Sequence, residues 1–306
     1  MRDSVVECVP NFSEGHDRGK VVAILDAMRV EGVSLLDWSM DGDHQRSVVT
    51  IAGPPQPVLE GVVRAAGRAA ELIDLTAQRG VHPRIGATDV IPFVPVSGIS
   101  LAECAMLARQ AGLSIWNRYG IPIYFYEAAA SRPDRALLEY VRQGQFEGLR
   151  ESALRDATRR PDLGGPELHP TAGAIAVGAR QFLIAYNLYL DRPDVAVARA
   201  IARAVRASSG GLKGVKAMGV LVRGREQISL NITDFRLTPV GEVFAGISRF
   251  AESHGAKVVD AELIGLVPEE AFERDSEWVR LTSEFKPEER ILERRLLQPL
   301  EWPRIR

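Results

Sequence analysis

Residues 47–96 read SVVTIAGPPQPVLEGVVRAAGRAAELIDLTAQRGVHPRIGATDVIPFVPV, and this stretch decides the fold. Apolar runs at 47–52 and 90–96 are typical of strands. Between them, apolar side chains recur at helical spacing over 57–75, which indicates a long amphipathic helix. The stretch therefore predicts two strands joined by a helix, with a loop that carries His82 just before the second strand.

The segments that precede this stretch complete a pattern of six elements. They are expected to be strands at 5–9 and 33–36, a helix at 20–28 and a loop at 39–45. The order strand, helix, strand, strand, helix, strand is that of a ferredoxin-like βαββαβ unit. A helix at 100–111, a strand at 122–126 and a mostly helical segment at 128–156 extend it.

The same order returns after residue 180. It predicts strands at 182–190, 215–222, 227–234 and 257–267, with helices at 193–207 and 239–253. Asp191 is expected near the start of the first of these helices. The predicted fold class is therefore α/β (α+β), with two ferredoxin-like subdomains at 1–180 and 181–306. We expect their sheets to face each other across a ligand groove, and the charged tail from 273 to be a surface or partner-contact element.

Composition narrows the class of protein. The chain has 306 residues, 46% of them hydrophobic, and a net charge of −2, so it lacks the basic surface of a nucleic-acid binder. No apolar run reaches the roughly 18 residues of a membrane span, and no signal peptide is indicated. Cys8 and Cys104 show no paired spacing. A cytoplasmic protein that binds neither nucleic acid nor membrane is expected.

His82 is the first candidate for chemistry. Histidine titrates near neutral pH and can act as a general acid or base. Pro83 restricts the backbone of His82, and Arg84 projects from the same side of an extended segment. A cation there would hold a substrate carboxylate and favour a neutral imidazole. A surface-loop histidine remains the alternative interpretation.

Other polar residues carry weaker signals. Asp41, Asp43 and His44 lack the ligand spacing of a calcium or zinc site, so no metal is expected. Asn11 and Ser13 stand between a strand and a helix, where they either cap the helix or bind an anion. Asn187, Asn231 and Asp234 either stabilise the fold or face a ligand.

Five segments together resemble one known family, glutamate formiminotransferase, in its single-chain bacterial form. They are CVPNFSEG at 8–15, LLD at 35–37 followed by DHQRSV at 43–48, HPRIGATDVIPFVPV at 82–96, HPTAGAIAVGARQFLIAYNLYL at 169–190 and SLNITDF at 229–235. The similarity runs in order from about residue 5 to 270. The family corresponds to the transferase part of formiminotransferase-cyclodeaminase.

The resemblance implies transfer of a formimino group from N-formimino-L-glutamate to N5 of tetrahydrofolate, in a homodimer of a histidine-catabolic enzyme. The family's catalytic histidine falls on His82. Its glycine-rich folate-binding segment falls on residues 163–172, which are Leu163, Gly164, Gly165, Pro166, Glu167, Leu168, His169, Pro170, Thr171 and Ala172.

The remaining roles follow from these expectations. Asp37 and Asp234 are expected to steer His82 or the formimino cation. Substrate-binding residues are expected to be Arg46, Arg84, Asn11, Ser13 and Asn187. The chain has Val81 and Ser39 where family members often carry acidic residues. A related reaction of 5-formyltetrahydrofolate is therefore one alternative, and a non-catalytic ferredoxin-like binding protein is another.

Overall fold

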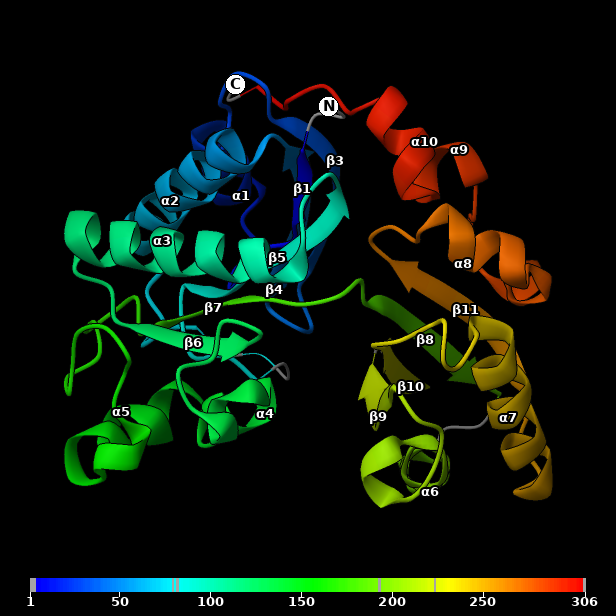
Figure 1. Cartoon of the computed structure of the whole chain (residues 1–306). Helices are drawn as coiled ribbons and strands as arrows, with labels where there is room; N and C mark the ends of the chain where they lie inside the picture. The colour runs from blue at the N-terminus through cyan, green and yellow to red at the C-terminus, as the bar shows by residue number, and fades with distance from the viewer. Residues whose placement is uncertain (1–3, 79, 81–82, 192–193, 223, 305–306) are drawn as a thin grey trace. The chain divides into compact units, whose positions relative to one another are not determined.

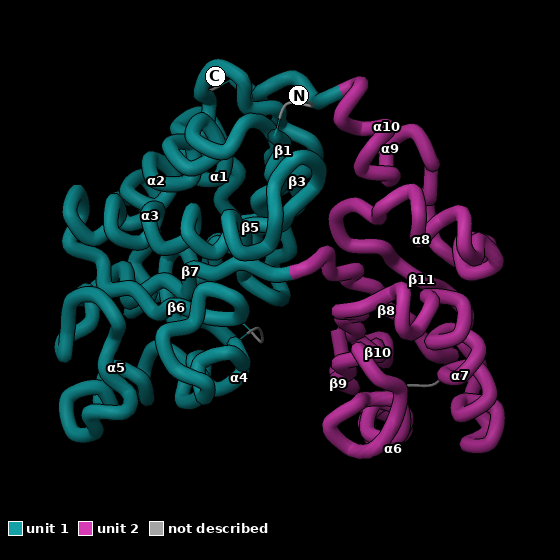
Figure 2. Tube along the Cα trace, viewed as in Figure 1, with its two compact units in different colours: residues 1–180, 299–306 teal, residues 181–298 magenta. Residues whose placement is uncertain are grey.

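The computed structural model describes residues 4–78, 80, 83–191, 194–222 and 224–304 (Figure 1). The chain divides into two compact units, residues 1–180 with 299–306 and residues 181–298 (Figure 2). Both units combine a β-sheet with helices. The predicted α/β class is confirmed, and the architecture is compatible with two ferredoxin-like subdomains.

The first unit is built on a seven-stranded sheet. Its strands are β1 (Val5–Cys8), β2 (Asn11–Phe12), β3 (Ser34–Asp41), β4 (Arg46–Gly53), β5 (Thr88–Ser97), β6 (Ile123–Glu127) and β7 (Ile175–Ala179). β1 and β2 both lie between β4 and β5 and run antiparallel to them. The order β3–β4–β1–β5 is the ferredoxin-like core, and β7 and β6 extend it in parallel beyond β5.

Three helices pack on the apolar face of this sheet: α1 (Arg18–Ala27), α2 (Pro55–Leu72) and α3 (Leu101–Tyr119). α2 begins with proline in its first turn. Proline is tolerated there because the N–H groups of the first turn make no hydrogen bond within the helix. α3 begins with a capping box formed by Ser100 and Glu103, and it ends at Gly120 in the left-handed conformation.

Shorter elements cover part of the opposite face. These are α4 (Leu138–Val141), α5 (Gln145–Arg155) and the 3₁₀ turns η1 (Pro133–Ala136) and η2 (Ala157–Arg159). Val141 and Leu149 pack there against Tyr124, Tyr126 and Ala176 of β6 and β7. The expected helical stretch at 128–156 therefore exists as separate short pieces.

The second unit contains an antiparallel sheet in the order β11–β8–β10–β9. Its main elements are β8 (Ile184–Leu190), α6 (Val195–Val205), β9 (Val215–Val222), β10 (Arg225–Ile232), α7 (Val240–Ser253) and β11 (Val258–Ile264). This strand order is the ferredoxin-like one. The smaller elements are η3 (Ala207–Ser209), α8 (Glu269–Arg274), η4 (Glu277–Leu281), α9 (Pro287–Arg290) and α10 (Leu292–Leu297).

Three local expectations are corrected. The loop expected from residue 39 begins only after β3 ends at Asp41, because Trp38 and Met40 pack on the core and extend the strand. The helix α6 is capped by Asp194, and Asp191 instead accepts a hydrogen bond from Lys257 N at 2.8 Å. The tail is not only a surface element, since Trp278 is fully buried in the second unit.

The last described residues belong to the first unit. Leu300 N donates to Leu35 O at 2.8 Å, so the chain end forms a bridge with the outer side of β3. Leu300 and Trp302 pack against the core of that unit. Among the described residues, no helix combines the length and apolar character that a bilayer crossing requires. The groove expected between the two sheets stays a prediction.

Candidate functional site

The first-unit sheet carries polar side chains on the face opposite α1, α2 and α3. Successive residues of a strand point to opposite faces. In β3 and β4 the core residues are Trp38, Met40, Val49 and Ile51, so their neighbours point away from the core. The polar residues on that side are Glu7, Asn11, Asp37, Ser39, Asp41, Arg46 and Thr50, and we call this set the polar face.

Strand register brings three predicted site residues onto the polar face. Asp37 lies opposite Thr50, and Asp41 lies opposite Arg46. Asn11 lies opposite Val48 on the other side of β4. Side chains of directly opposite residues are in contact range, with Cβ atoms about 5 Å apart. Asn11, Asp37 and Arg46, which are far apart in the sequence, therefore lie on one surface of one sheet.

Arg46 stands at the charged end of the polar face. Burial and the nearby charge of Arg142 lower the pKa of Arg46 to about 9, and Asp89 opposes this shift. The guanidinium stays protonated at neutral pH. Asp89 is itself buried, with Ile85 N donating to its Oδ1 at 2.9 Å and Arg142 forming an ion pair with its Oδ2. A cation in such surroundings suits an anionic ligand group.

Hydrogen bonds attach the Asn11–Ser13 segment to Val9 and to the residues that precede β5. Asn11 Nδ2 donates to Val9 O at 2.8 Å, while its buried Oδ1 has no hydrogen-bond partner among the described residues. Ser13 Oγ donates to Gly86 O at 2.7 Å, and Ser13 N donates to Ala87 O at 2.9 Å. Asn11 therefore has an acceptor atom to offer, whereas Ser13 connects β2 to the segment that enters β5.

Arg84 is buried and surrounded by acceptors. Its Nη2 donates to Glu147 Oε1 at 2.9 Å and to Gln78 O at 3.0 Å. Its Nη1 lies 3.4 Å from Gln145 Oε1 and from Glu147 Oε2. These contacts are those of an arginine that fixes local structure. The expected role of Arg84 as a carboxylate anchor stays a prediction.

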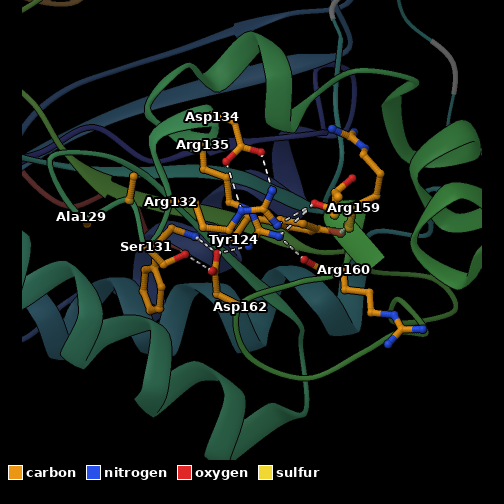
Figure 3. A network of polar contacts seen from close by, with 12 residues as sticks. Tyr124, Ala129, Ser131, Arg132, Asp134, Arg135, Arg159, Arg160 and Asp162 are labelled. Atoms are coloured by element: carbon orange, nitrogen blue, oxygen red, sulfur yellow. Dashed lines mark hydrogen bonds and ion pairs between the residues drawn. The ribbon is translucent and has the colours of Figure 1, made fainter. Parts of the chain in front are cut away.

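Residues 163–172 are fixed at their beginning by a polar network around Asp162 (Figure 3). Arg135 forms an ion pair with Asp162 Oδ2 at 2.5 Å, and Phe125 N donates to the same oxygen at 2.8 Å. Ser131 Oγ donates to the other carboxylate oxygen. In addition, Ile123 N donates to Leu163 O at 3.0 Å, so the segment starts from a rigid point beside β6.

The middle of this segment depends on glycine. Gly164 and Gly165 have positive φ values of 76° and 84°, a conformation that side-chain-bearing residues rarely adopt. A Cβ at Gly164 would lie 2.5 Å from the Trp116 ring. The Gly165–Pro166 peptide bond is cis, and residues 165–167 are exposed. Gly165 is therefore a point of the segment where a flat ligand can approach the exposed backbone closely.

The predicted residues of the second unit lie in different surroundings. Asn187 points away from the core, and its Nδ2 lies 3.5 Å from Glu262 Oε2, which also accepts from Tyr189 Oη at 2.8 Å. Asp234 follows β10, and its Oδ1 accepts from Arg236 N and Leu237 N at 3.1 Å. Asp234 thus forms the turn before α7, and its expected catalytic role stays a prediction.

Two further features bear on where a ligand could bind. The described residues contain no group of histidine, cysteine or carboxylate side chains that could hold a metal ion. A cavity of about 350 Å³ lies in the second unit between α6 and β9, lined by Arg199, Ala202, Arg203, Arg206, Met218, Gly219 and Val220. None of the predicted site residues lines this cavity.

Comparison with known proteins adds an independent observation. Residues 5–180 match the family model for the N-terminal subdomain of the formiminotransferase domain, and residues 185–289 match the model for the formiminotransferase domain. The glutamate formimidoyltransferase of Streptococcus pyogenes is 41% identical over 296 residues, which cover 96% of this chain and 99% of the relative. This chain belongs to the formiminotransferase family.

Other formiminotransferase relatives agree. The glutamate formimidoyltransferase of Thermoplasma acidophilum is 42% identical over 273 residues, covering 88% of this chain and 89% of the relative. The formimidoyltransferase-cyclodeaminase of Dictyostelium discoideum is 39% identical, and this chain matches 51% of its length. The predicted family membership is confirmed.

The expected catalytic histidine of the formiminotransferase, His82, lies outside the described residues, as does Val81. Two residues before His82, an added Cβ on Gly80 would lie 2.5 Å from Gln45 Cβ, and two residues after it, Arg84 is buried. Gln45 immediately precedes Arg46 of the polar face. The segments on either side of His82 are thus attached to well-packed parts of the first unit.

Sequence reasoning missed the partners that hold these residues. Glu147 contacts Arg84, and Arg142 contacts Asp89. Both lie in a polar stretch whose sequence indicated a helix and no functional motif. Asp162 was not singled out either. Asp162 lies two residues before the Gly164–Gly165 pair, and its ion pair with the buried Arg135 is a tertiary contact that the sequence does not report.

Proposed function

We propose that this chain transfers the formimino group of N-formimino-L-glutamate to N5 of tetrahydrofolate, giving 5-formiminotetrahydrofolate and L-glutamate. The observation that carries the proposal is the 41% identity to a glutamate formimidoyltransferase over almost the full length of both chains. Tetrahydrofolate is then a co-substrate. A homodimer and a cytoplasmic location are part of the proposal and rest on the family resemblance alone.

The chemistry requires one proton to move. N5 of tetrahydrofolate attacks the formimino carbon and loses a proton as a tetrahedral intermediate forms. The glutamate nitrogen gains a proton when its bond to that carbon breaks. We assign both transfers to His82, because a single imidazole can accept and then return a proton. Holding both substrates in one site supplies much of the rate by removing the entropy of their encounter.

The polar face supports this assignment by its charges. Asp37 provides a carboxylate for the formimino cation, and Arg46 provides a cation for a substrate carboxylate. Asn11 offers an acceptor through its Oδ1. Residues 163–172 are proposed to bind folate through their exposed glycine-rich backbone. Arg84, Ser13 and Asn187 are proposed to bind substrate, Asp234 is proposed to steer His82 or the formimino cation, and the proposed mechanism uses no metal.

A related folate reaction is the alternative, in which 5-formyltetrahydrofolate is the one-carbon donor and L-glutamate the acceptor, giving N-formyl-L-glutamate and tetrahydrofolate. Ser39 favours it, since it lies on the polar face beside Asp37 where family members often carry an acid. A neutral hydroxyl would stabilise a cationic formimino group less than a carboxylate would. The presence of Ser39 therefore affects which one-carbon donor is expected, and it does not change the proposed folate-binding segment.

The deciding experiment measures both reactions side by side. The full chain is incubated with tetrahydrofolate and formiminoglutamate, and separately with 5-formyltetrahydrofolate and L-glutamate, and the products are identified by mass spectrometry. We expect glutamate and 5-formiminotetrahydrofolate to form in equal amounts in the first mixture. Turnover only in the second mixture would support the alternative. Folate binding without turnover in either would identify a binding protein.

A further inference from the structure

The imidazole of His169 is bound by the backbone of its own loop. Its Nδ1 accepts from Ala172 N at 3.0 Å and lies 3.4 Å from Thr171 N. A ring nitrogen that accepts hydrogen bonds carries no proton, so the neutral ring has its proton on Nε2. Burial lowers the pKa of His169 below its usual value, which agrees with a neutral ring.

The backbone closes the same loop. His169 N donates to Gly173 O at 2.9 Å, and Gly173 N donates to His169 O at 3.0 Å. Gly173 has a φ of 69°, and a Cβ there would lie 2.1 Å from Ile85 O. Residues 169–173 are therefore a closed turn whose inward-pointing N–H groups are satisfied by one imidazole nitrogen.

This turn connects to two other segments of the first unit. Leu75 N donates to Thr171 O, and Ala87 N donates to Ala172 O, both at 2.9 Å. Ala174 N donates to Ile85 O at 3.0 Å. Ile85 and Ala87 follow His82 by three and five residues. A change in the turn would therefore displace both the folate-binding segment and the chain that leads away from His82.

We infer that His169 is a positioning residue, whose Nδ1 holds residues 163–172 in the shape that binds tetrahydrofolate, and that it exchanges no proton with substrate. The inference rests on the proposed function. It differs from a direct catalytic role, because Nδ1 is occupied by backbone donors. It also differs from a general packing role, because it requires an acceptor atom at one position of the side chain.

Two amide substitutions separate these roles. In His169→Asn the side-chain oxygen can take the place of Nδ1, whereas in His169→Gln the amide reaches the place of Nε2 and leaves the two N–H groups without their acceptor. We expect His169→Gln to raise KM for tetrahydrofolate about tenfold, the effect of one or two lost hydrogen bonds. We expect His169→Asn to raise this KM much less than His169→Gln does, because its oxygen restores the acceptor, and to keep the pH profile of kcat.

A second readout does not depend on activity. Gly164 packs on Trp116, so the ring reports the shape of the segment. The full chain is labelled with 5-fluorotryptophan, and the Trp116 resonance is assigned with Trp116→Phe. The fluorine resonance should shift in His169→Gln and stay in place in His169→Asn. If His169→Gln fails to fold while His169→Asn folds, the result also supports the inference, because only the asparagine restores the acceptor.

Equal behaviour of the two variants overturns the inference, whether both match the unaltered chain or both lose tetrahydrofolate binding to the same extent. A pH profile of kcat that changes in His169→Asn also overturns it, since the ring would then take part in proton transfer. If the unaltered chain shows no transfer, the proposed function fails. The Trp116 resonance still decides whether Nδ1 shapes the segment.

Discussion

Arg84 and Glu147 form an ion pair, with 2.9 Å between Nη2 and Oε1, that joins the chain after His82 to the first turn of α5. Phe146 N donates to Arg84 O at 2.8 Å beside it. The same Nη2 of Arg84 also donates to Gln78 O at 3.0 Å. The segments on both sides of His82 are thus connected through one side chain, and the geometry of the proposed acid–base residue depends on it.

Glu147→Gln tests this dependence. The charge of the pair is lost while the shape is kept, so the segment after His82 should be held less firmly, and kcat should fall about three- to tenfold. KM for both substrates should change by less than about twofold. Steady-state kinetics measures both parameters. Glu151→Gln, on the same helix and exposed, is the matched control. A raised KM for formiminoglutamate with unchanged kcat would instead favour Arg84 as a carboxylate anchor.

His82→Ala tests the proposed proton transfer itself. Removal of a general acid–base group should lower kcat by at least about a hundredfold. We expect far-ultraviolet circular dichroism to be unchanged, which would show that the variant keeps its fold. His254→Ala, at the end of α7 in the second unit, is the control and should retain activity. Unchanged turnover of the His82 variant would remove this residue from the mechanism.

Gly164→Ala tests the glycine-rich segment. The new Cβ would meet the Trp116 ring in a left-handed backbone conformation, so stability should fall by about 1–3 kcal/mol. The rise in melting temperature caused by tetrahydrofolate should shrink or vanish. Gly148→Ala is the control, because nothing lies within 4 Å of its added Cβ. That change, inside α5, should stabilise the protein by about 0.5–1 kcal/mol. A full ligand shift in Gly164→Ala contradicts the proposed binding segment.

Asp89→Asn tests the charge balance around Arg46. The amide keeps an acceptor for Ile85 N but removes the buried negative charge that pairs with Arg142 and raises the pKa of Arg46. Breaking a buried pair in this way should lower the free energy of unfolding by about 3 kcal/mol. Urea unfolding measures the change. Asp26→Asn, exposed on α1, should lie within about 0.5 kcal/mol of the unaltered chain. A similarly small effect of Asp89→Asn would show that the negative charge of Asp89 does not contribute to stability.

His169 predicts a pH dependence of stability. Its folded-state pKa lies below its usual value, so the unfolded chain binds the proton first. The contribution of the neutral ring is present above the unfolded pKa of about 6.5 and is lost as pH falls through the folded pKa. Between pH 7 and 5 the unaltered chain should therefore lose more stability than His169→Asn. Parallel curves of unfolding free energy against pH would show that the ring does not contribute.

Local patterns predicted the order of the elements. The strand expected at 47–52 is β4, Arg46–Gly53, and the helix expected at 57–75 is α2, Pro55–Leu72. Both have clear periodicity because one face is buried. The end of β3 was missed, since polar residues at 37, 39 and 41 suggest a loop until Trp38 and Met40 are seen to pack on the core.

The candidate site was predictable only in part. Asn11, Asp37 and Arg46 could be named from the sequence, but strand register alone places them on one face. The partner of Arg84 lies 63 residues away along the chain. No local pattern reports such a pair, because its energy comes from tertiary contact. For the same reason the fixed start of residues 163–172 at Asp162 could not be foreseen.

The bridge between Leu300 and Leu35 has a consequence for solubility. β3 pairs with β4 on one side only, and an outer strand with free amide and carbonyl groups invites pairing with other molecules. The chain end occupies part of that position, with Leu300 and Trp302 covering apolar surface. Removing the residues after 298 would thus expose the edge of β3 and the apolar surface beside it. We expect the shortened protein to self-associate through this edge.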